Sequence, residues 1–356
     1  RSSFRATPPT RPQNGVRRKV SETPCQTSGV SRRLRRLGYH GPVESARSVD
    51  FQRVARSLIL RATDQPAVAG FVRRHGLRLG ASRFVAGETL DDCVKVLRSL
   101  QDRGFLTNTT LLGERVTDEA DVRRTAEAYE QVLDRLDREG LRTYLSVKLS
   151  QLGLDVDEGL AYRTLRGLVA QAAERGRFVR VDMEESWRVD PTLRIYRRLR
   201  AEGYDNVGVV LQSYLYRSEE DLRELLPLKP AVRIVKGAYL EPPTVAFPRK
   251  ADVDRNYLRL VEMAFEGGAH VAVATHDERI HAHVVDFTQR RGIPAEAFQF
   301  QMLYGVRPRL QRDLVSRGYR VLVATPFGPD WYRYFMRRLA ERPANVGFVL
   351  RNLLRA

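Results

Sequence analysis

Cysteine is almost missing from this sequence, and so are several common site motifs. Cys25 and Cys93 are the only cysteines among 356 residues, which argues against a disulfide framework or a structural zinc site and fits a reducing cytosol. The sequence has no run of about 18 apolar residues that would form a membrane-spanning helix. Neither a GxGxxG after an expected strand nor a GxSxG is present, so we expect no Rossmann nucleotide site and no nucleophile elbow.

Acidic residues are scarce at the N-terminal end. Residues 1–43 contain nine arginines, one lysine and a single acid, Glu22, and so carry half of the net charge of +18. Because Pro, Ser and Thr are frequent and apolar periodicity is absent, we expect residues 1–47 to be a disordered basic segment. The segment also lacks the apolar region of a secretory signal.

The positive charge raises the alternative of a basic nucleic-acid-binding protein. From residue 44 on, the charge is spread over amphipathic segments, without an aromatic-interleaved basic stripe or a known nucleic-acid motif. Arginine outnumbers lysine 55 to 6, which is as well explained by coding bias as by a partner. We therefore expect no nucleic-acid partner.

Helical periodicity begins near Ser48. Residues 48–105 predict N-terminal helices that pack on a following domain, including a helix over 89–103 with Thr89 as its N-cap.

From residue 106 to 356, apolar runs alternate with amphipathic segments. The expected strands are 109–112, 143–149, 178–183, 207–212, 232–236, 270–275, 298–302 and 319–325. The expected helices include 158–175, 192–201, 219–226, 254–266, 278–290, 308–317 and 331–342. Eight repeats predict an α/β fold of the (β/α)8, TIM-like class, with a doubly wound open sheet as the alternative.

Most of the expected strands end in polar residues. These are Lys148, Asp182, Glu184, Gln212, Lys236, Thr275, His276, Asp277 and Gln301. In a parallel barrel all carboxyl ends open on one face, which carries the active site in barrel enzymes. His276 has no second His or Cys at ligand spacing, so we expect no metal. The adjacent acids Glu184 and Glu185 point to opposite faces of a strand, so they do not form a glycosidase pair.

Two basic features stay ambiguous from their pattern alone. Arg233 lies inside an apolar strand that ends in Lys236 and Gly237, which fits a site for an anionic cofactor or a solvated strand end. Arg337 and Arg338 lie beside the apolar stripe of the last helix. They could pair with Glu341 on the surface or hold a substrate carboxylate, and spacing alone favours the surface pair.

Taken together, these residues resemble a known family. The motifs are LLGE (111–114), SVKLSQLG (146–153), VDMEES (181–186), VLQSYLYR (210–217), RIVKGAYLEP (233–242), KADVDRNYLRLV (250–261), ATHDERI (274–280), FQFQMLYG (298–305) and DWYRYFMRRLAERPAN (330–345). From about Ser48 to Leu354 the chain resembles the FAD-dependent monofunctional proline dehydrogenases, also called proline oxidases. The resemblance implies a distorted (β/α)8 barrel that binds FAD over the strand ends. It implies oxidation of L-proline to 1-pyrroline-5-carboxylate, with electrons passed to a quinone.

The resemblance also implies roles for individual residues. Arg233 would lie near flavin N5, and Asp182 would orient and polarise the substrate-binding set. Lys148, Arg337 and Arg338 would hold the proline carboxylate, and Tyr239 would line the pocket. Contacts to FAD are implied for Met183, Gln212, Lys236, Gly237, Ala238, Thr275 and His276. The implied partners are a quinone and pyrroline-5-carboxylate dehydrogenase, in the cytoplasm or at the inner face of the membrane.

Two departures from the family pattern concern the substrate. The family's YVPYG reads ATPFG here, so Ala324 replaces a tyrosine expected to wall the substrate ring, and Thr110 replaces an acid before LLGE. A hydroxyproline or other cyclic imino acid dehydrogenase is therefore an alternative on the same scaffold. A folate-reducing flavin barrel is a more distant one.

We expect deletion of residues 1–43 to leave flavin content and proline oxidation unchanged, because nothing in the segment is patterned to pack. Flavin absorbance per chain and the initial rate of proline oxidation would be compared with the full chain. A shortened protein that folds but has lost its flavin would contradict this expectation.

Overall fold

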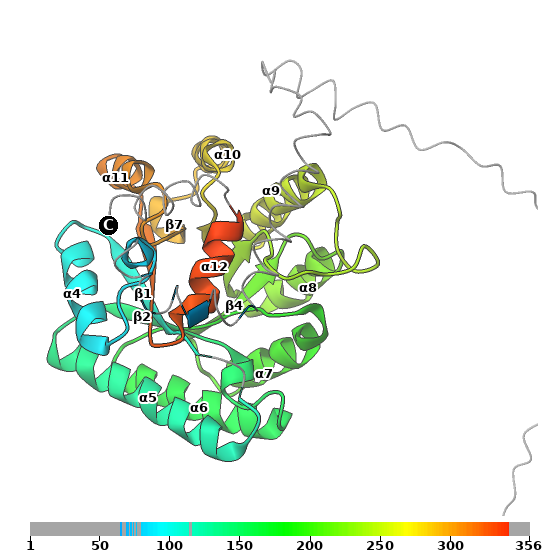
Figure 1. Ribbon diagram of the computed structural model, residues 1–356. Coiled ribbons are helices and arrows are strands. Elements are labelled where there is room, and N and C mark those ends of the chain that lie inside the picture. The colour runs from blue at the N-terminus through cyan, green and yellow to red at the C-terminus, as the bar shows by residue number, and fades with distance from the viewer. Residues whose placement is uncertain are drawn as a thin grey trace, which may run out of the picture. The chain divides into compact units, whose positions relative to one another are not determined.

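The central element is a closed barrel. A computed structural model describes residues 65, 69, 70, 72, 74, 76, 80–113 and 116–341. Within them eight strands form a barrel in chain order, closed by parallel pairing of β1 with β8 (Figure 1). The strands are β1 (Leu106–Leu111), β2 (Thr143–Val147), β3 (Val179–Val181), β4 (Val207–Gln212), β5 (Ala231–Val235), β6 (His270–Ala274), β7 (Phe298–Leu303) and β8 (Val321–Phe327). The (β/α)8 prediction is confirmed, and the open sheet is excluded.

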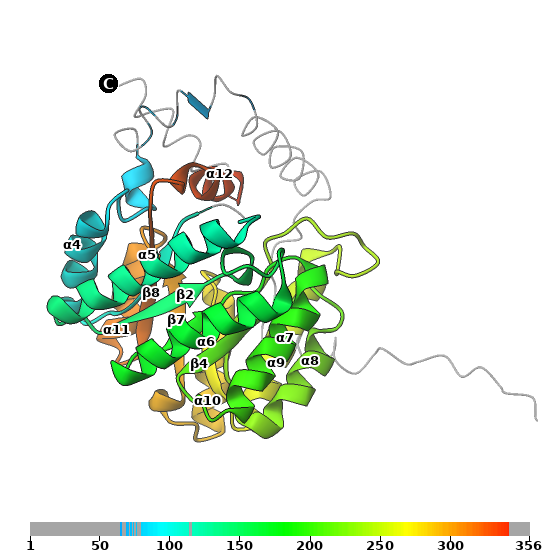
Figure 2. The ribbon, with the colours of Figure 1, turned by 90° about the horizontal axis from the view of Figure 1, so that it is seen from below.

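Helices follow the strands and surround the barrel (Figures 1 and 2). They are α4 (Leu90–Gln101), α5 (Glu119–Arg138), α6 (Glu158–Glu174), α7 (Val189–Ala201), α8 (Ser218–Leu225), α9 (Lys250–Glu266), α10 (Glu278–Arg290), α11 (Pro308–Ser316) and α12 (Trp331–Glu341). Short 3-10 turns, η1 to η5, cover Ala81–Arg83, Leu149–Gln151, Ser186–Arg188, Leu226–Leu228 and Ala295–Ala297. None of the helices in the described part is long and apolar enough to cross a membrane.

Most predicted boundaries differ from the observed ones by a few residues. β4 and α10 have the predicted bounds, whereas β1 begins three residues earlier than expected, at Leu106. The predicted strand 178–183 was too long, because β3 ends at Val181 and leaves Asp182 and Met183 in the following loop. The helix α5 was not among the helices named from the sequence.

The two faces of the strands differ in character. Outward-facing residues such as Val147, Val209 and Val273 are fully buried beneath the helices. Inward-facing residues include Ser146 and Arg233, which hydrogen bond to each other across the barrel from β2 and β5. The barrel interior is therefore strongly polar on one side, unlike the layers of branched apolar residues that usually fill such barrels.

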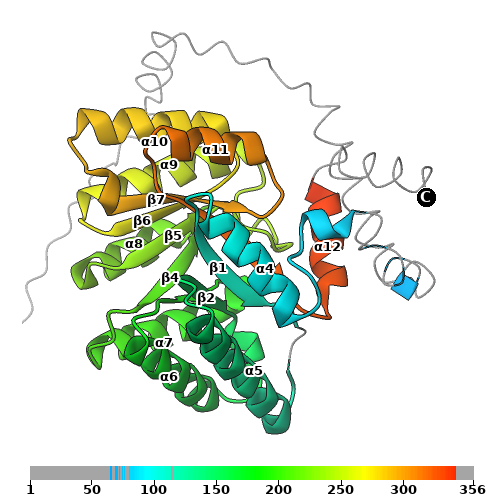
Figure 3. The same cartoon turned by 90° about the vertical axis from the view of Figure 1, so that its left-hand side faces the viewer.

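The first and last described helices distort the barrel plan. On the outside, α4 packs against both β8 and β1, which is the position normally taken by the helix after the eighth strand. Instead, α12 packs through Trp331 and Phe335 on Phe84 and on Leu112, which follows β1. Figures 1 and 3 show α12 set apart from the ring of helices. The last helix thus lies at the carboxyl ends of the strands.

The N-terminal predictions are only partly covered by the described residues. Within 89–103 the helix is confirmed as α4, and the Thr89 hydroxyl accepts a hydrogen bond from the Asp92 amide at 3.2 Å. The N-terminal helices expected between residues 48 and 64 lie outside the described residues. The boundaries at residues 47 and 105 stay predictions.

One glycine after β5 is fixed by packing. Gly237 has a φ of 111°, and a Cβ atom there would collide with the ring of Tyr214, in the loop after β4. Gly176 also has a positive φ, of 62°, but a Cβ atom there would meet nothing within 4 Å. Comparing alanine substitutions at these two glycines therefore separates the cost of backbone strain from the cost of a steric collision.

We expect Gly176→Ala to lower the free energy of unfolding by about 1 kcal/mol, because only the positive φ disfavours alanine. Gly237→Ala should lower it by about 1–3 kcal/mol more, because the ring of Tyr214 must also move. Urea unfolding of the two variants measures the difference. An equal decrease in the free energy of unfolding for both variants would mean that the ring of Tyr214 moves aside at no cost.

Candidate active site

The centre of the site is a carboxylate that bridges two cations. Asp182, directly after β3, accepts hydrogen bonds from Lys148 Nζ at 2.9 Å and from Arg233 Nη1 at 2.8 Å. Arg233 Nη2 also donates to Ser146 Oγ at 3.0 Å, and Asn108 Nδ2 donates to the same oxygen at 2.5 Å. Side chains from β1, β2, β3 and β5 thus form one network inside the barrel.

This network carries excess positive charge. Burial alone would raise the pKa of Asp182, but Lys148 and Arg233 more than offset it, so the pKa lies below its usual value. Burial lowers the pKa of Arg233 in spite of the nearby carboxylate. Arg233 Nε is buried without a hydrogen-bond partner among the described residues. One carboxylate for two cations favours an anionic ligand at this place.

Lys236 belongs to a second cluster. Its Nζ lies 2.6 Å from Asp254 Oδ1 and 3.2 Å from Asp277 Oδ2. Burial alone would raise the pKa of Asp277, but the opposing effect of Lys236 is larger, and the pKa is lowered to about 2. The structure therefore pairs Lys236 with two acids and does not join it to Asp182. Gly237, next in the chain, packs on the ring of Tyr214, and the cofactor contact expected from the sequence stays a prediction.

The acids after Asp182 have structural partners. Glu184 accepts hydrogen bonds from Ser150 N at 3.0 Å and from Ser150 Oγ at 2.6 Å, while Glu185 pairs with Arg188. Gln212 Nε2 donates to the backbone oxygen of Glu184 at 2.8 Å. Among the described residues, neither glutamate forms an ion pair or hydrogen bond with a side chain of the Asp182 network. Met183 is buried within the core.

The end of β6 contributes Thr275 and His276. The Leu303 amide donates to His276 Nε2 at 2.9 Å, so in a neutral ring the proton is on Nδ1. Thr275 is buried, and its hydroxyl accepts a hydrogen bond from the Asp277 amide at 3.2 Å. Two predicted residues, Gln301 and Ala238, lie close to strand ends as well, the first buried and the second exposed. No group of acidic, histidine or cysteine side chains in the described part could hold a metal ion.

Tyr239 and α12 lie at the same end of the barrel. The pKa of Tyr239 is raised mainly by burial and further by Glu184 and Glu185, and Arg337 opposes this rise. Arg337 is therefore close enough to Tyr239 to act on it electrostatically across the barrel end. Arg338 is partly buried, and its guanidinium carbon lies 5.2 Å from the centre of the Tyr334 ring. The side chain of Glu341 lies outside the described residues, so its pairing stays a prediction.

Ala324 faces the network from β8. It pairs in register with Asn108 of β1 and with Leu303 of β7, and neighbouring residues in register share one face of a sheet. Since Asn108 points inward, Ala324 does so as well. Ala324 thus presents only a methyl group to the barrel interior.

Sequence reasoning missed Ser146, Asn108 and Arg180. The signal was available for two of them, because Ser146 lies two residues before Lys148 and Arg180 lies two before Asp182. Alternate residues of a strand share a face. Because Lys148 and Asp182 were expected to point into the barrel, Ser146 and Arg180, each two residues earlier, could have been expected to point inward as well.

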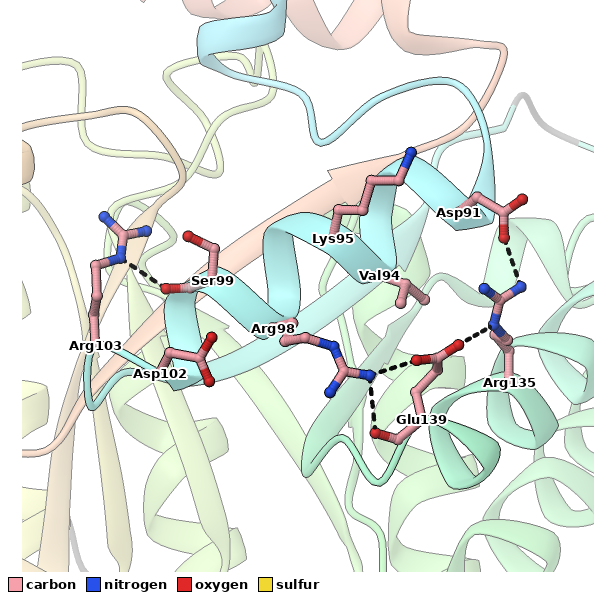
Figure 4. Close-up of a pocket in the computed structure, with 9 residues that line it drawn as sticks. All are labelled: Asp91, Val94, Lys95, Arg98, Ser99, Asp102, Arg103, Arg135 and Glu139. Carbon is pink, nitrogen blue, oxygen red and sulfur yellow. Dashed lines mark hydrogen bonds and ion pairs between the residues drawn. The ribbon is translucent and has the colours of Figure 1, made fainter.

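Two grooves of the described surface lie away from the Asp182 network. The larger, of about 620 Å³, is on the outside, where α4 and α5 meet (Figure 4). Its ion pairs join Arg135 to Asp91 at 2.5 Å and to Glu139 at 2.9 Å, so its charges largely satisfy one another. A smaller groove of about 220 Å³ includes Phe105 and Tyr304. Neither contains a residue of the Asp182 network, and the candidate site at the barrel end is assigned on that network.

A closed (β/α)8 barrel with a charged network at the strand ends defines a barrel enzyme. The family model described as proline dehydrogenase matches residues 93–351, and the chain belongs to this family. It is 44% identical over 304 residues to a proline dehydrogenase of Deinococcus radiodurans, covering 84% of this chain and 98% of that protein. It is 40% identical over 300 residues to proline dehydrogenase 1 of Bacillus subtilis strain 168, covering 84% of this chain and 99% of that one.

A solved structure shows the same fold. The chain is similar to proline utilization A from Bdellovibrio bacteriovorus inactivated by N-propargylglycine, with a TM-score of 0.71 and 24% sequence identity. The match covers 82% of this chain but only 36% of that longer one. At this identity the likeness establishes the fold alone.

We expect Asp182→Asn to lower the free energy of unfolding by about 3 kcal/mol at neutral pH, because it leaves Lys148 and Arg233 without their shared counter-charge. Asp286→Asn is the matched control. Its carboxylate pairs with Arg290 on the surface, where the loss should be below about 1 kcal/mol. Urea unfolding gives both values.

The pH dependence has a defined sign. The folded pKa of Asp182 is depressed, so its stabilising effect is present above the unfolded carboxyl pKa of about 3.9 and is lost as the pH falls toward the folded value. The gap in stability between wild type and Asp182→Asn should therefore shrink below about pH 4. A gap that is constant down to pH 3 would contradict the charge argument.

Proposed function

We propose that this protein oxidises L-proline to 1-pyrroline-5-carboxylate with bound FAD and passes the electrons to a quinone. Membership of the proline dehydrogenase family supports the substrate and the reaction class. The observation that carries the proposal is the network in which Asp182 bridges Lys148 and Arg233 beneath Tyr239 and α12. It offers cationic donors for a carboxylate at the open end of the barrel.

The residues at the strand ends fit a flavin. Arg233 has a buried Nε that still requires a hydrogen-bond acceptor, and its guanidinium is fixed by Asp182 and Ser146. The residues proposed to contact FAD are Met183, Gln212, Lys236, Gly237, Ala238, Thr275 and His276, with Arg233 near N5. When bound, FAD accepts the hydride that leaves the ring carbon next to the proline nitrogen.

The protein's own groups would hold and orient the substrate. Lys148, Arg337 and Arg338 bind the carboxylate, because charge-assisted hydrogen bonds to guanidinium and ammonium groups are the strongest available. Asp182 fixes the positions of Lys148 and Arg233 through an ion pair with each. Tyr239 closes the pocket beside α12. Loss of the hydride and of the nitrogen proton converts the C–N single bond of the ring into a double bond.

The partners follow from this chemistry. A quinone would reoxidise the flavin. The protein would be cytoplasmic or would bind peripherally at the inner face of the membrane. The product would pass to a pyrroline-5-carboxylate dehydrogenase, completing the conversion of proline to glutamate.

Purification of the full chain tests the proposal directly. A yellow protein whose flavin absorbance is bleached by L-proline without oxygen supports it. Addition of a soluble quinone should then restore the colour. A colourless protein that shifts DNA in a gel would support the nucleic-acid alternative and reject the enzyme.

A second candidate keeps the barrel and the flavin but changes the substrate. Because Ala324 faces the interior with only a methyl group, the pocket has room for a ring substituent. Hydroxyproline or another cyclic imino acid is then the preferred substrate.

We expect Arg337→Met and Arg338→Met each to raise the KM for proline by orders of magnitude with the fold intact. Loss of a charge-assisted partner in a partly desolvated pocket weakens binding by roughly 2–5 kcal/mol. Arg290→Met, on the outer surface of α10, is the matched control and should leave KM unchanged. Unaltered kinetics in both α12 variants would assign the pair to the protein surface.

We expect Ala324→Tyr to narrow the preference toward proline, because the larger side chain fills the space next to the substrate ring. The measurement is the ratio of kcat/KM for proline and hydroxyproline in wild type and variant. A ratio that stays the same would mean that another residue forms this wall.

A further inference from the structure

Arg180 is a buried cation that the proposed reaction does not use. It lies on β3 with 2% of its surface exposed. Its Nη1 donates to the backbone oxygens of Val209 at 3.1 Å and Ala231 at 2.5 Å, and its guanidinium carbon lies 4.9 Å from the centre of the Phe178 ring. Among the described residues no carboxylate forms an ion pair with it. A charge buried in this way is normally paired.

The neighbouring strand makes room for this guanidinium. Gly208 of β4 pairs in register with Arg180, and a Cβ atom there would collide with Arg180 Nη1. An apolar side chain could fill the same space without the cost of burying a charge. Filling the barrel therefore does not by itself account for an arginine at this position.

The charge acts on the network above it. Burial and the repulsion from Arg233 lower the pKa of Arg180 to about 9, so it stays charged at neutral pH. Arg180 also helps to depress the pKa of Asp182 and of His270. Arg180, Lys148 and Arg233 together face one carboxylate of the network, Asp182.

We propose that Arg180 is a positioning residue that acts through Arg233 and raises the positive potential inside the barrel. Resting on the proposed function, the inference is that this potential strengthens the hold on the substrate carboxylate. It also stabilises the negative charge that the flavin gains on reduction. A fixed charge in a site that excludes water acts on such groups more strongly than it would in water.

The test compares Arg180→Gln, which keeps amide donors for the two backbone oxygens, with Arg180→Lys, which keeps the charge. The first probe is cyclopentanecarboxylate, a ring carboxylate without the reacting nitrogen. Its neutral partner is cyclopentanecarboxamide, and both are titrated against the flavin absorbance of the holoenzyme. The second readout is the midpoint potential of the bound flavin.

In Arg180→Gln we expect carboxylate affinity to fall about tenfold, because one buried positive charge is removed from the barrel interior. Carboxamide affinity should not change. The midpoint potential should become more negative by about 30 mV for each tenfold change in the two-electron equilibrium. Arg180→Lys should retain most of both properties.

Gly208→Ala is a control for packing. It crowds the guanidinium of Arg180 without removing its charge, so it should lower the unfolding midpoint while the flavin potential stays close to that of wild type.

Three results would overturn the inference. The first is an unchanged midpoint potential of the flavin in Arg180→Gln. The second is an equal loss of affinity for cyclopentanecarboxylate and cyclopentanecarboxamide. The third is a failure of every Arg180 variant to fold, which would mean that Arg180 serves the structure of the barrel. If wild type has no flavin, the proposed function fails and this inference fails with it. A wild type that proline reduces, together with any of the three results, rejects the inference alone.

Discussion

The structure of this barrel depends on one carboxylate. Of the acids in the described part of the chain, only Asp182 has a direct ion pair with the inward cations Lys148 and Arg233, and without it the two would repel each other inside the barrel. Its position directly after β3 lets it contact the neighbouring strand β2 and also reach across to β5. Ser146 and Asn108 then fix the free side of the Arg233 guanidinium. The orientation of both cations is therefore set before any ligand is present, as preorganised electrostatic sites require.

A second constraint comes from the exchange of helix positions. Because α4 covers the outside of β8 and β1, the chain after β8 does not return to that groove, and α12 packs at the strand ends instead. The contacts of Trp331 and Phe335 with Phe84 hold it there. This packing brings Arg337 within electrostatic reach of Tyr239. Phe84 and α4 thus affect the position of α12 at the candidate site without contributing a residue to the Asp182 network.

The barrel could be predicted because most strands are apolar runs followed by a segment of helical periodicity, and both signals are local, whereas β1 is mostly polar. The position of α12 could not, since its apolar stripe would look the same packed on the side of the barrel or at its end. The Asp182 network was predicted only in part. Lys148 and Asp182 were visible as polar strand ends, and Ser146 could have been found from its place two residues before Lys148, whereas Asn108 lies within a strand and carries no strong signal. The packing of Gly237 on Tyr214 could not be predicted from the sequence, because it depends on a contact between two loops, and the cofactor contact at Gly237 stays a prediction.

The charge balance connects these features to the proposed chemistry. In the protein without substrate, three inward cations face one carboxylate, and such an excess of positive charge is unfavourable in a site that is largely shielded from solvent. On the proposed function, the substrate carboxylate neutralises one cation, and the charge that the flavin gains on reduction neutralises another. The stability given up in the resting protein is then recovered as the substrate binds and the reaction proceeds. Interactions that strengthen along the reaction are those that accelerate it, because uniform binding does not raise turnover.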